Sequence, residues 1–222
     1  MREQIKVTGM VLSAMSVGEY DKRVVLLTAE RGKLSGFVRG ARRTGSMLMA
    51  GSRPFSFGTF TLYGGRDSYT ISAMEINNYF AELAVDIEGA YYGFYFMEVA
   101  GYLGTENTNE TEMLKLLYYS LKALTNESLP NVLVRRIFEL KMMVLNGEYA
   151  VEPPIKAVES TAYAIEFVAY SMIEKLYTFN LSKESLREFD RCIHIFKTKY
   201  LKHTFRAHEI LKIMVDENSI LK

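Results

Sequence analysis

The stretch Gly18–Arg43, GEYDKRVVLLTAERGKLSGFVRGARR, decides the fold of the first part of the chain. Two apolar, β-branched runs, Tyr20–Ala29 and Lys33–Arg39, flank a tight turn at Glu30–Lys33. This pattern predicts two neighbouring strands joined by a hairpin turn. The second strand ends in a basic cluster of Arg39, Arg42 and Arg43. A small β-unit that carries cations and an aromatic residue along one strand suits a phosphate backbone better than a catalytic pocket.

The residues around this hairpin extend the strand pattern over the first 80 positions. The predicted strands are Ile5–Ser13, Tyr20–Ala29, Lys33–Arg39, Ser56–Tyr63 and Ser68–Ile76. A longer connection, Ala41–Arg53, is rich in Gly, Ser and Arg, and we expect it to be mobile; a short helix at Ser46–Ala50 is the alternative. Five short strands with one long connection predict an OB-type barrel.

From Ala81 onward the apolar spacing becomes helical. One segment shows this clearly, because Pro130 opens a run with Leu133, Ile137, Leu140 and Val144 on one face, and Gly147 closes it. The fold class is therefore α+β, with a five-stranded barrel over residues 1–80 and an all-helical domain over residues 81–222.

The two predicted domains also differ in their net charge. Residues 1–80 carry 11 Lys/Arg and 6 Asp/Glu, whereas residues 81–222 carry 16 and 20. We therefore expect any polyanion to dock on the barrel, although short segments also drift by several charges at random. A single cysteine, Cys192, excludes a disulfide framework. The chain shows no apolar signal core and no bilayer-length apolar run, so we expect a cytoplasmic protein.

The sequence contains no recognisable catalytic motif. A catalytic triad needs a serine or cysteine near a histidine and an acid, but the three histidines all lie within His194–His208, where a helix surface explains them more simply. No glycine-rich phosphate loop is present. We expect no enzyme activity, no cofactor and no metal, since one cysteine cannot supply a thiolate site and the histidines diverge on their helix.

Nucleic-acid binding has the best case. Period-two alternation places Lys33, Ser35, Phe37 and Arg39 on one face of the third strand. The predicted DNA-binding residues are Lys33, Phe37, Arg39, Arg42, Arg43, Arg31, Arg53 and Arg66. Tyr63 and Tyr69 are weaker candidates for stacking. Taken singly, each arginine is better explained as a solvated surface charge, and it is the group on one strand that favours binding. A second basic region, Arg187–Arg206, is either an amphipathic surface helix or a second DNA contact.

Several motifs, in order, are similar to those of a known family. They are Gly18-Glu19-Tyr20-Asp21-Lys22, Glu30-Arg31-Gly32-Lys33, Gly40-Ala41-Arg42-Arg43, Pro54-Phe55, Arg135-Arg136-Ile137-Phe138-Glu139-Leu140 and Asn146-Gly147. Together they resemble the bacterial recombination mediator RecO. Many members hold zinc through two Cys-x-x-Cys pairs inserted in the helical domain; here that insertion is absent near residues 152–157.

The resemblance implies a non-enzymatic protein of recombination and DNA repair, associated with the nucleoid during repair. Such proteins bind single- and double-stranded DNA and anneal complementary strands. With RecR, and often RecF, they help RecA replace single-stranded-DNA-binding protein (SSB), whose C-terminal tail they engage. Two alternatives stay open: a protein-interaction scaffold with weak or lost DNA binding, and an RNA-binding OB protein.

The tail that the resemblance implies is acidic and ends in apolar residues, so its site needs an apolar groove with cations at the rim. Arg135, Arg136 and Lys141, interleaved with Val134 and Phe138, are the predicted partner-binding residues. The competing interpretation is that these apolar neighbours belong to the core.

Overall fold

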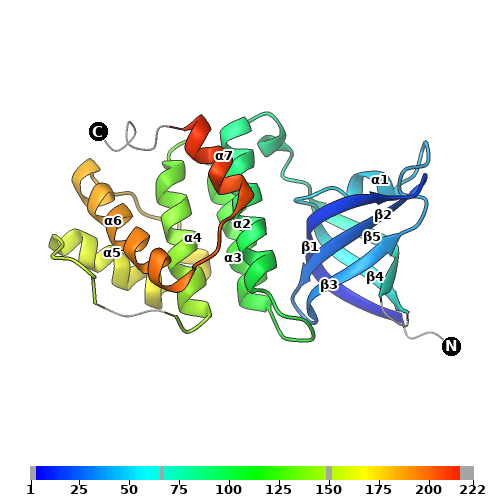
Figure 1. Ribbon diagram of the computed structural model, residues 1–222, viewed down its shortest axis with the longest axis horizontal. Helices are drawn as coiled ribbons and strands as arrows, with labels where there is room; N and C mark the ends of the chain where they lie inside the picture. Colours follow the sequence, from blue (N-terminus) through cyan, green and yellow to red (C-terminus); the bar gives the residue numbers. More distant parts are fainter. Residues whose placement is uncertain (1–3, 66–67, 149–151, 216–222) are drawn as a thin grey trace. The chain divides into compact units, whose positions relative to one another are not determined.

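The computed structural model describes residues 4–65, 68–148 and 152–215, shown in Figure 1. By their internal contacts these residues form two compact units. The first holds the chain up to Ala81 together with Ala100–Leu114, and the second holds Glu82–Val99 and the described residues from Lys115 onward. The inclusion of Ala100–Leu114 in the barrel unit was not expected from the sequence.

The first unit is a closed five-stranded barrel. Its strands are β1 (Gln4–Val17), β2 (Asp21–Thr28), β3 (Gly32–Val38), β4 (Phe57–Gly64) and β5 (Tyr69–Asn78), in the order β1-β2-β3-β5-β4. A short helix, α1 (Leu48–Gly51), lies between β3 and β4. β1 closes the barrel because it pairs antiparallel with both β2 and β4. This arrangement confirms the predicted OB-type barrel.

Alternation along β3 sorts its side chains as the sequence predicts. Leu34 and Val38 are buried in the barrel core, together with Val24 and Leu26 of β2. Lys33, Ser35 and Phe37 point to the other side and are half-buried. The outer surface of β2 and β3 is therefore the surface on which the predicted cations lie.

The connection Ala41–Arg53 contains the helix α1, which is the alternative to the expected mobile segment. Hydrogen bonds fix the start of this connection, since the Gly40 amide just before it donates to the side-chain Oδ1 of Asp21 at 2.8 Å and the Arg42 amide donates to the Tyr20 carbonyl at 2.9 Å. The buried Ser52 anchors its far end. The arginines of this connection are thus held against the end of the barrel.

The segment Ala100–Leu114 joins the barrel at the β2–β3 turn. The Lys33 amide donates to the Thr105 carbonyl at 2.8 Å, and the Asn107 amide donates to the Arg31 carbonyl at 3.0 Å. Gly32 has φ +63°, and a Cβ there would stand 2.1 Å from the Thr105 carbonyl oxygen. Only glycine fits this close approach, which explains the glycine of the turn.

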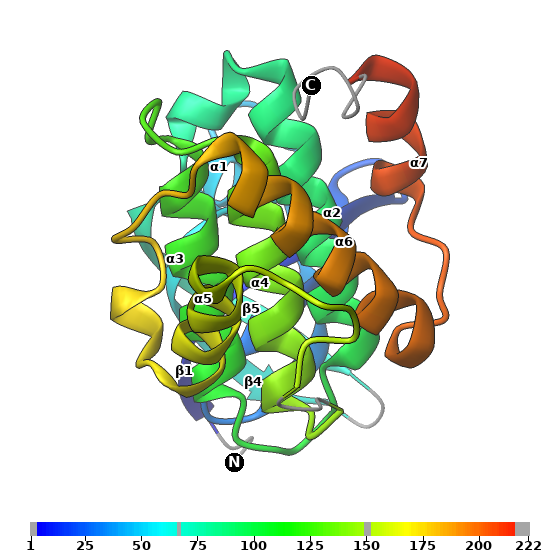
Figure 2. The ribbon, with the colours of Figure 1, turned by 90° about the vertical axis from the view of Figure 1, so that its left-hand side faces the viewer.

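The second unit is helical. Its elements are α2 (Ile87–Leu103), whose last turn belongs to the barrel unit, α3 (Thr111–Leu124), whose first turn belongs to the barrel unit as well, α4 (Asn131–Leu145), α5 (Glu159–Tyr170), α6 (Lys183–Tyr200) and α7 (Arg206–Met214), with short 3₁₀ segments at Ala81–Ala84 and Ile173–Lys175. Figure 2 shows α4 in the middle of these helices. Every residue from Val132 to Met143 is buried. None of the described helices is long and apolar enough to cross a membrane.

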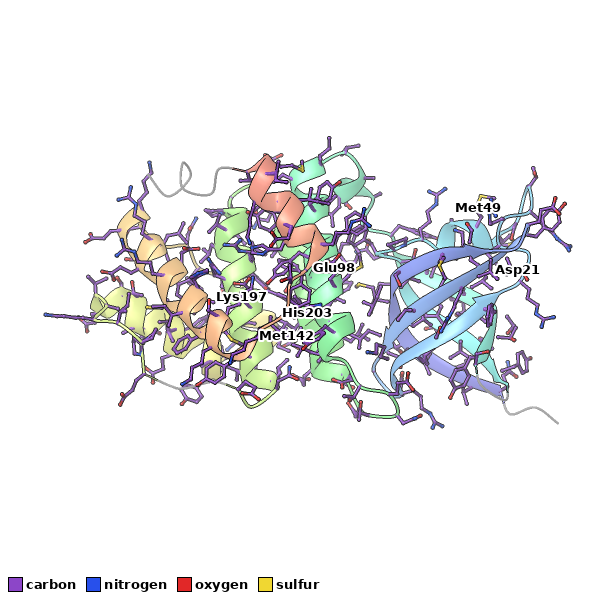
Figure 3. The ribbon with its side chains drawn as sticks, in the orientation of Figure 1. Asp21, Met49, Glu98, Met142, Lys197 and His203 are labelled. Carbon is purple, nitrogen blue, oxygen red and sulfur yellow. The ribbon has the colours of Figure 1, made fainter. Side chains whose placement is uncertain are left out.

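Because α4 is buried on all sides, its charged residues must find partners inside the protein. Arg136 Nη1 donates to Glu139 Oε2 at 2.8 Å, and Arg136 Nε donates to Asp190 Oδ1 of α6 at 2.7 Å. Lys197 Nζ of α6, labelled in Figure 3, lies 3.1 Å from Glu139 Oε1. The hydroxyl of Tyr95 on α2 donates to the same oxygen at 2.6 Å. A buried ionic network therefore joins α2, α4 and α6.

Glu139 is the centre of this network. Burial by itself would raise the pKa of Glu139, but the positive charges of Lys197, Arg136 and Arg135 outweigh it and hold the pKa well below its usual range. The carboxylate is therefore ionised in the folded protein. Its contribution to stability is present above the pKa of an unfolded glutamate and is lost as the pH falls below it.

Arg135 extends the network to α7. Its Nη1 lies 3.3 Å from Nε2 of His208, and its Nη2 lies 3.5 Å from Asp190 Oδ1. Burial, with the charges of Lys197 and Arg135, lowers the pKa of His208 to about 3. The imidazole is therefore neutral near pH 7, and Nε2 can accept a hydrogen bond from the guanidinium.

The partner site predicted on Arg135, Arg136 and Lys141 is corrected by this burial. Their relative exposures are 0%, 4% and 7%. Lys141 Nζ donates to the carbonyls of Ala169 and Ser171 at 2.9 and 2.8 Å, where it satisfies the C-terminus of α5. These cations cannot line the rim of a surface groove. The competing interpretation, that Val134 and Phe138 are core, is the one observed.

We predict that replacing Glu139 with Gln lowers the free energy of unfolding of the helical unit by about 3–5 kcal/mol, because Arg136 and Lys197 lose their shared buried carboxylate. The matched control is Glu174→Gln. Glu174 pairs with Lys115 at 3.7 Å, with both side chains more than 40% exposed, so its loss should cost about 0–1 kcal/mol. Urea titrations followed by circular dichroism measure both values. Equal stability of the two variants would contradict the assigned role of the network.

Candidate nucleic-acid interface

The outer face of β2 and β3 forms the middle of the candidate interface. Arg23 of β2 stands opposite Phe37 of β3 in the strand register. Its Nε donates to Ser35 Oγ at 2.8 Å, which fixes the guanidinium on this face. A cation beside an aromatic ring on a strand surface suits a single nucleic-acid strand, which offers phosphates and base faces together. Arg23 was not among the predicted residues, although alternation from the buried Val24 could have placed it there.

Beyond the end of β3 the predicted arginines gather. Arg39, Arg42 and Arg43 are all exposed. Arg42 Nη1 donates to the Gly18 carbonyl at 3.2 Å, and the Arg43 guanidinium lies 5.3 Å from the centre of the Tyr20 ring. The turn after β1 therefore steers two of these side chains. Figure 3 labels Asp21, which lies in this region and accepts a hydrogen bond from the Gly40 amide.

Lys22 and Arg53 complete a group that we call the basic end: Lys22, Arg39, Arg42, Arg43 and Arg53. Lys22 Nζ donates to Ser52 Oγ at 3.1 Å. The pKa of Lys22 is lowered by burial and by the positive charges of Arg53 and Arg42. In the described part of the chain, no ion pair joins any member of the basic end to a carboxylate. Cations that gather at a surface and form no ion pairs attract an anion.

The remaining predicted residues have different surroundings. Lys33 Nζ donates to the Gly101 carbonyl in the last turn of α2 at 2.8 Å, so this ammonium helps to hold the segment after Ala100 on the barrel. Arg31 is exposed at the β2–β3 turn, and Tyr63 and Tyr69 are half-buried near the β4–β5 turn. Arg66 lies outside the described residues. The structure thus brings the arginines near β3 together and gives Lys33 a structural contact.

Two acidic residues of the segment Ala100–Leu114 lie toward the opposite end of β3, whereas Asp21 lies beside the Arg39 end. Glu106 bridges to Gly32 at the start of β3, and Glu110 accepts hydrogen bonds from Thr105 and Thr108 in the same segment. The charge along β3 therefore becomes more positive from Gly32 toward Arg39. A polyanion would approach the Arg39 end.

A zinc site built from two Cys-x-x-Cys pairs, as in many members of the family that this chain resembles, does not fit this chain. Its one cysteine, Cys192, is fully buried in α6, and burial with the nearby charge of Glu188 raises the thiol pKa to about 11. Zinc takes thiolates, which this environment disfavours. Within residues 4–65, 68–148 and 152–215, no three His, Cys, Asp or Glu side chains gather where they could hold a metal.

The fold defines the class: an OB-type barrel followed by a helical unit. Two family models match the chain in the same order. "Recombination protein O N terminal" matches residues 1–80, and "Recombination protein O C terminal" matches residues 84–151. The chain belongs to the RecO family, as its motifs indicated.

Three relatives with the name DNA repair protein RecO show how far the similarity extends. Those of Alkaliphilus metalliredigens and Caldicellulosiruptor bescii are 34% and 37% identical to this chain, each over 64% of this chain and 58% of the relative. The chain thus aligns with less than two thirds of their length. The relative from Acetivibrio thermocellus is 22% identical over 95% of this chain and 97% of its own length.

Proposed function

We propose that this chain is a non-enzymatic mediator of DNA recombination and repair that binds single- and double-stranded DNA through its barrel. The observation that carries the proposal is the basic end, five cations at one end of the barrel that form no ion pair with a carboxylate in the described residues. Phosphate contacts from such a group supply affinity for any DNA sequence, and the exposed face of β2 and β3 continues the track toward Phe37.

Annealing follows from the same charges. Two complementary strands repel each other through their phosphates, and arginines that neutralise those phosphates lower the repulsion. Base pairing then supplies the driving force, so the protein needs no chemical step. With RecR and RecF, the chain would help RecA load onto DNA that is covered by SSB. This part of the proposal rests on family membership.

The cations of α4 are buried, so the acidic tail of SSB would have to bind elsewhere on the chain. The outer face of α6 offers a site, because Arg191, Ile195 and Lys199 follow each other at four-residue spacing and are all exposed. Two cations around an exposed apolar side chain match an acidic peptide that ends in apolar residues. We therefore propose α6 as the contact for the tail.

Two alternatives remain distinct from DNA mediation. A scaffold with lost DNA binding is favoured by the near-neutral charge of the whole chain, +1. An RNA-binding protein would use the same cations and aromatic rings. Competition between RNA and DNA strands of equal length and sequence separates RNA from DNA binding, and binding of neither identifies the scaffold.

We predict that the triple variant Arg39→Ala, Arg42→Ala, Arg43→Ala weakens DNA binding and flattens the dependence of log K on log salt by up to about three units, near one for each lost phosphate contact. Fluorescence anisotropy with a labelled oligonucleotide across a salt series measures both. The matched control replaces three exposed lysines of the helical unit, Lys156, Lys175 and Lys183, and loses the same total charge. If both triple variants behaved alike, the basic end would not be the DNA site.

For the tail site, we predict that Arg191→Glu with Lys199→Glu weakens binding of an acidic, apolar-ended peptide at least tenfold, because both cations at the rim become repulsive. Isothermal titration calorimetry measures the affinity, and circular dichroism checks the fold. Lys122→Glu with Lys175→Glu, also exposed and in the helical unit, is the control. Unchanged peptide affinity in the folded α6 variant would move the site elsewhere.

A further inference from the structure

A hollow of about 340 Å³ opens on the outer face of the barrel, apart from the basic end. Three segments surround it: the face of β2 and β3, the described ends of the β4–β5 hairpin, and the loop at Glu106–Asn107. The lining residues used below are Arg23, Arg31, Lys33, Tyr69, Glu106 and Asn107. Its volume is at the lower end of the range of ligand pockets, roughly 300–1,000 Å³, and thus suits one small unit rather than a chain.

The chemistry of the lining is that of a nucleotide site. Arg23 uses Nε to reach Ser35, and its terminal nitrogens have no recorded partner among the described residues. Arg31 adds a second guanidinium on the neighbouring turn. Glu106 is the single carboxylate in the described lining, so the three cations leave the hollow positively charged. Guanidinium groups bind phosphate in a planar fork.

Tyr69 and Asn107 are residue types that offer a base an aromatic contact and hydrogen bonds. Tyr69 lines the hollow, on the strand that pairs with Gly36 of β3, and its half-buried side chain also packs against the barrel core. Asn107 has φ +60°, a left-handed conformation, and its amide donates to the Arg31 carbonyl at 3.0 Å. Asparagine tolerates this conformation better than most residues. The loop is thus held in place, and asparagine is a residue whose side-chain amide can hydrogen-bond to a base edge.

We propose that this hollow holds one unpaired nucleotide, with its phosphate toward Arg23 and Arg31 and its base against Tyr69. A base within a duplex is paired and stacked, so it cannot enter without leaving the helix. The hollow therefore favours single strands, whereas the basic end contacts the backbone of either form. This inference rests on the proposed function, DNA binding by the barrel.

The test compares a single strand with a hairpin duplex of matched length, by anisotropy at one fixed salt concentration. The variant is Tyr69→Leu with Asn107→Gly, since glycine accepts the positive φ at residue 107. Loss of a base–aromatic stack predicts about a tenfold or larger loss of affinity for the single strand. Affinity for the duplex should stay within about twofold. Tyr69→Phe keeps the ring and is the control that should bind like the wild type.

The outcomes separate the two proposals. Equal losses for both DNA forms, or no loss for the single strand, would overturn the nucleotide site and leave DNA binding by the barrel intact. A wild-type protein that bound neither form would overturn the proposed function and this inference with it. Because Tyr69 also packs against the barrel core, a second measurement uses the wild type. A single strand carrying 5-iodouracil should crosslink to Tyr69 on irradiation, and crosslinks found only at other residues would contradict the site.

Discussion

The barrel depends on β1, which pairs with β2 along one edge and with β4 along the other and so closes the sheet. Its first part, Gln4–Met10, pairs with β4, and its later part, Gly9–Val17, pairs with β2. Where the two ladders overlap, a Cβ on Gly9 would lie 2.7 Å from the Leu27 carbonyl oxygen, so the strands approach too closely there for a larger residue. Closure fixes which sides of β2 and β3 face outward, and with that the face on which Arg23 and Lys33 lie.

The same residue type takes opposite roles according to its burial. Arg136 is enclosed in the helical unit and neutralised by Glu139 and Asp190, so it holds helices together. Arg39 is exposed at the end of β3, with no carboxylate partner in the described part of the chain. Charge that is compensated inside a unit is structural, and charge that is left uncompensated at a surface is available to a ligand.

The sequence predicted the barrel well because its signals are local. Alternation in β3 and the glycine at position 32 define strand and turn without distant information. The segment Ala100–Leu114 could not be placed on the barrel, since its hydrogen bonds to Ala29, Arg31 and Lys33 arise only after folding. The same long-range contact gives Lys33 its partner on Gly101, which explains why a residue that fits the predicted basic face has a structural contact.

In the helical unit, the prediction from the sequence placed buried residues at the surface. In the sequence, Arg135, Arg136 and Lys141 resemble the polar residues of a surface helix. Apart from Glu139 on the same helix, the carboxylates and carbonyls that pair with them lie on α6 and at the end of α5, many residues away along the chain. A helix buried on all sides cannot be recognised from its own charges when their partners are distant. The near-continuous apolar run around these residues was the signal that favoured the core interpretation.

Hydrogen–deuterium exchange with and without a saturating single-stranded oligonucleotide tests the central claim. This claim is that the basic end and the outer face of β2 and β3 form the DNA site. The account predicts slower exchange in peptides that cover β2, β3 and residues 39–53. Exchange in peptides from α4 and α5 should not change, because these helices carry no part of the interface. Protection confined to the helical unit, with the barrel peptides unaffected at saturation, would contradict the account.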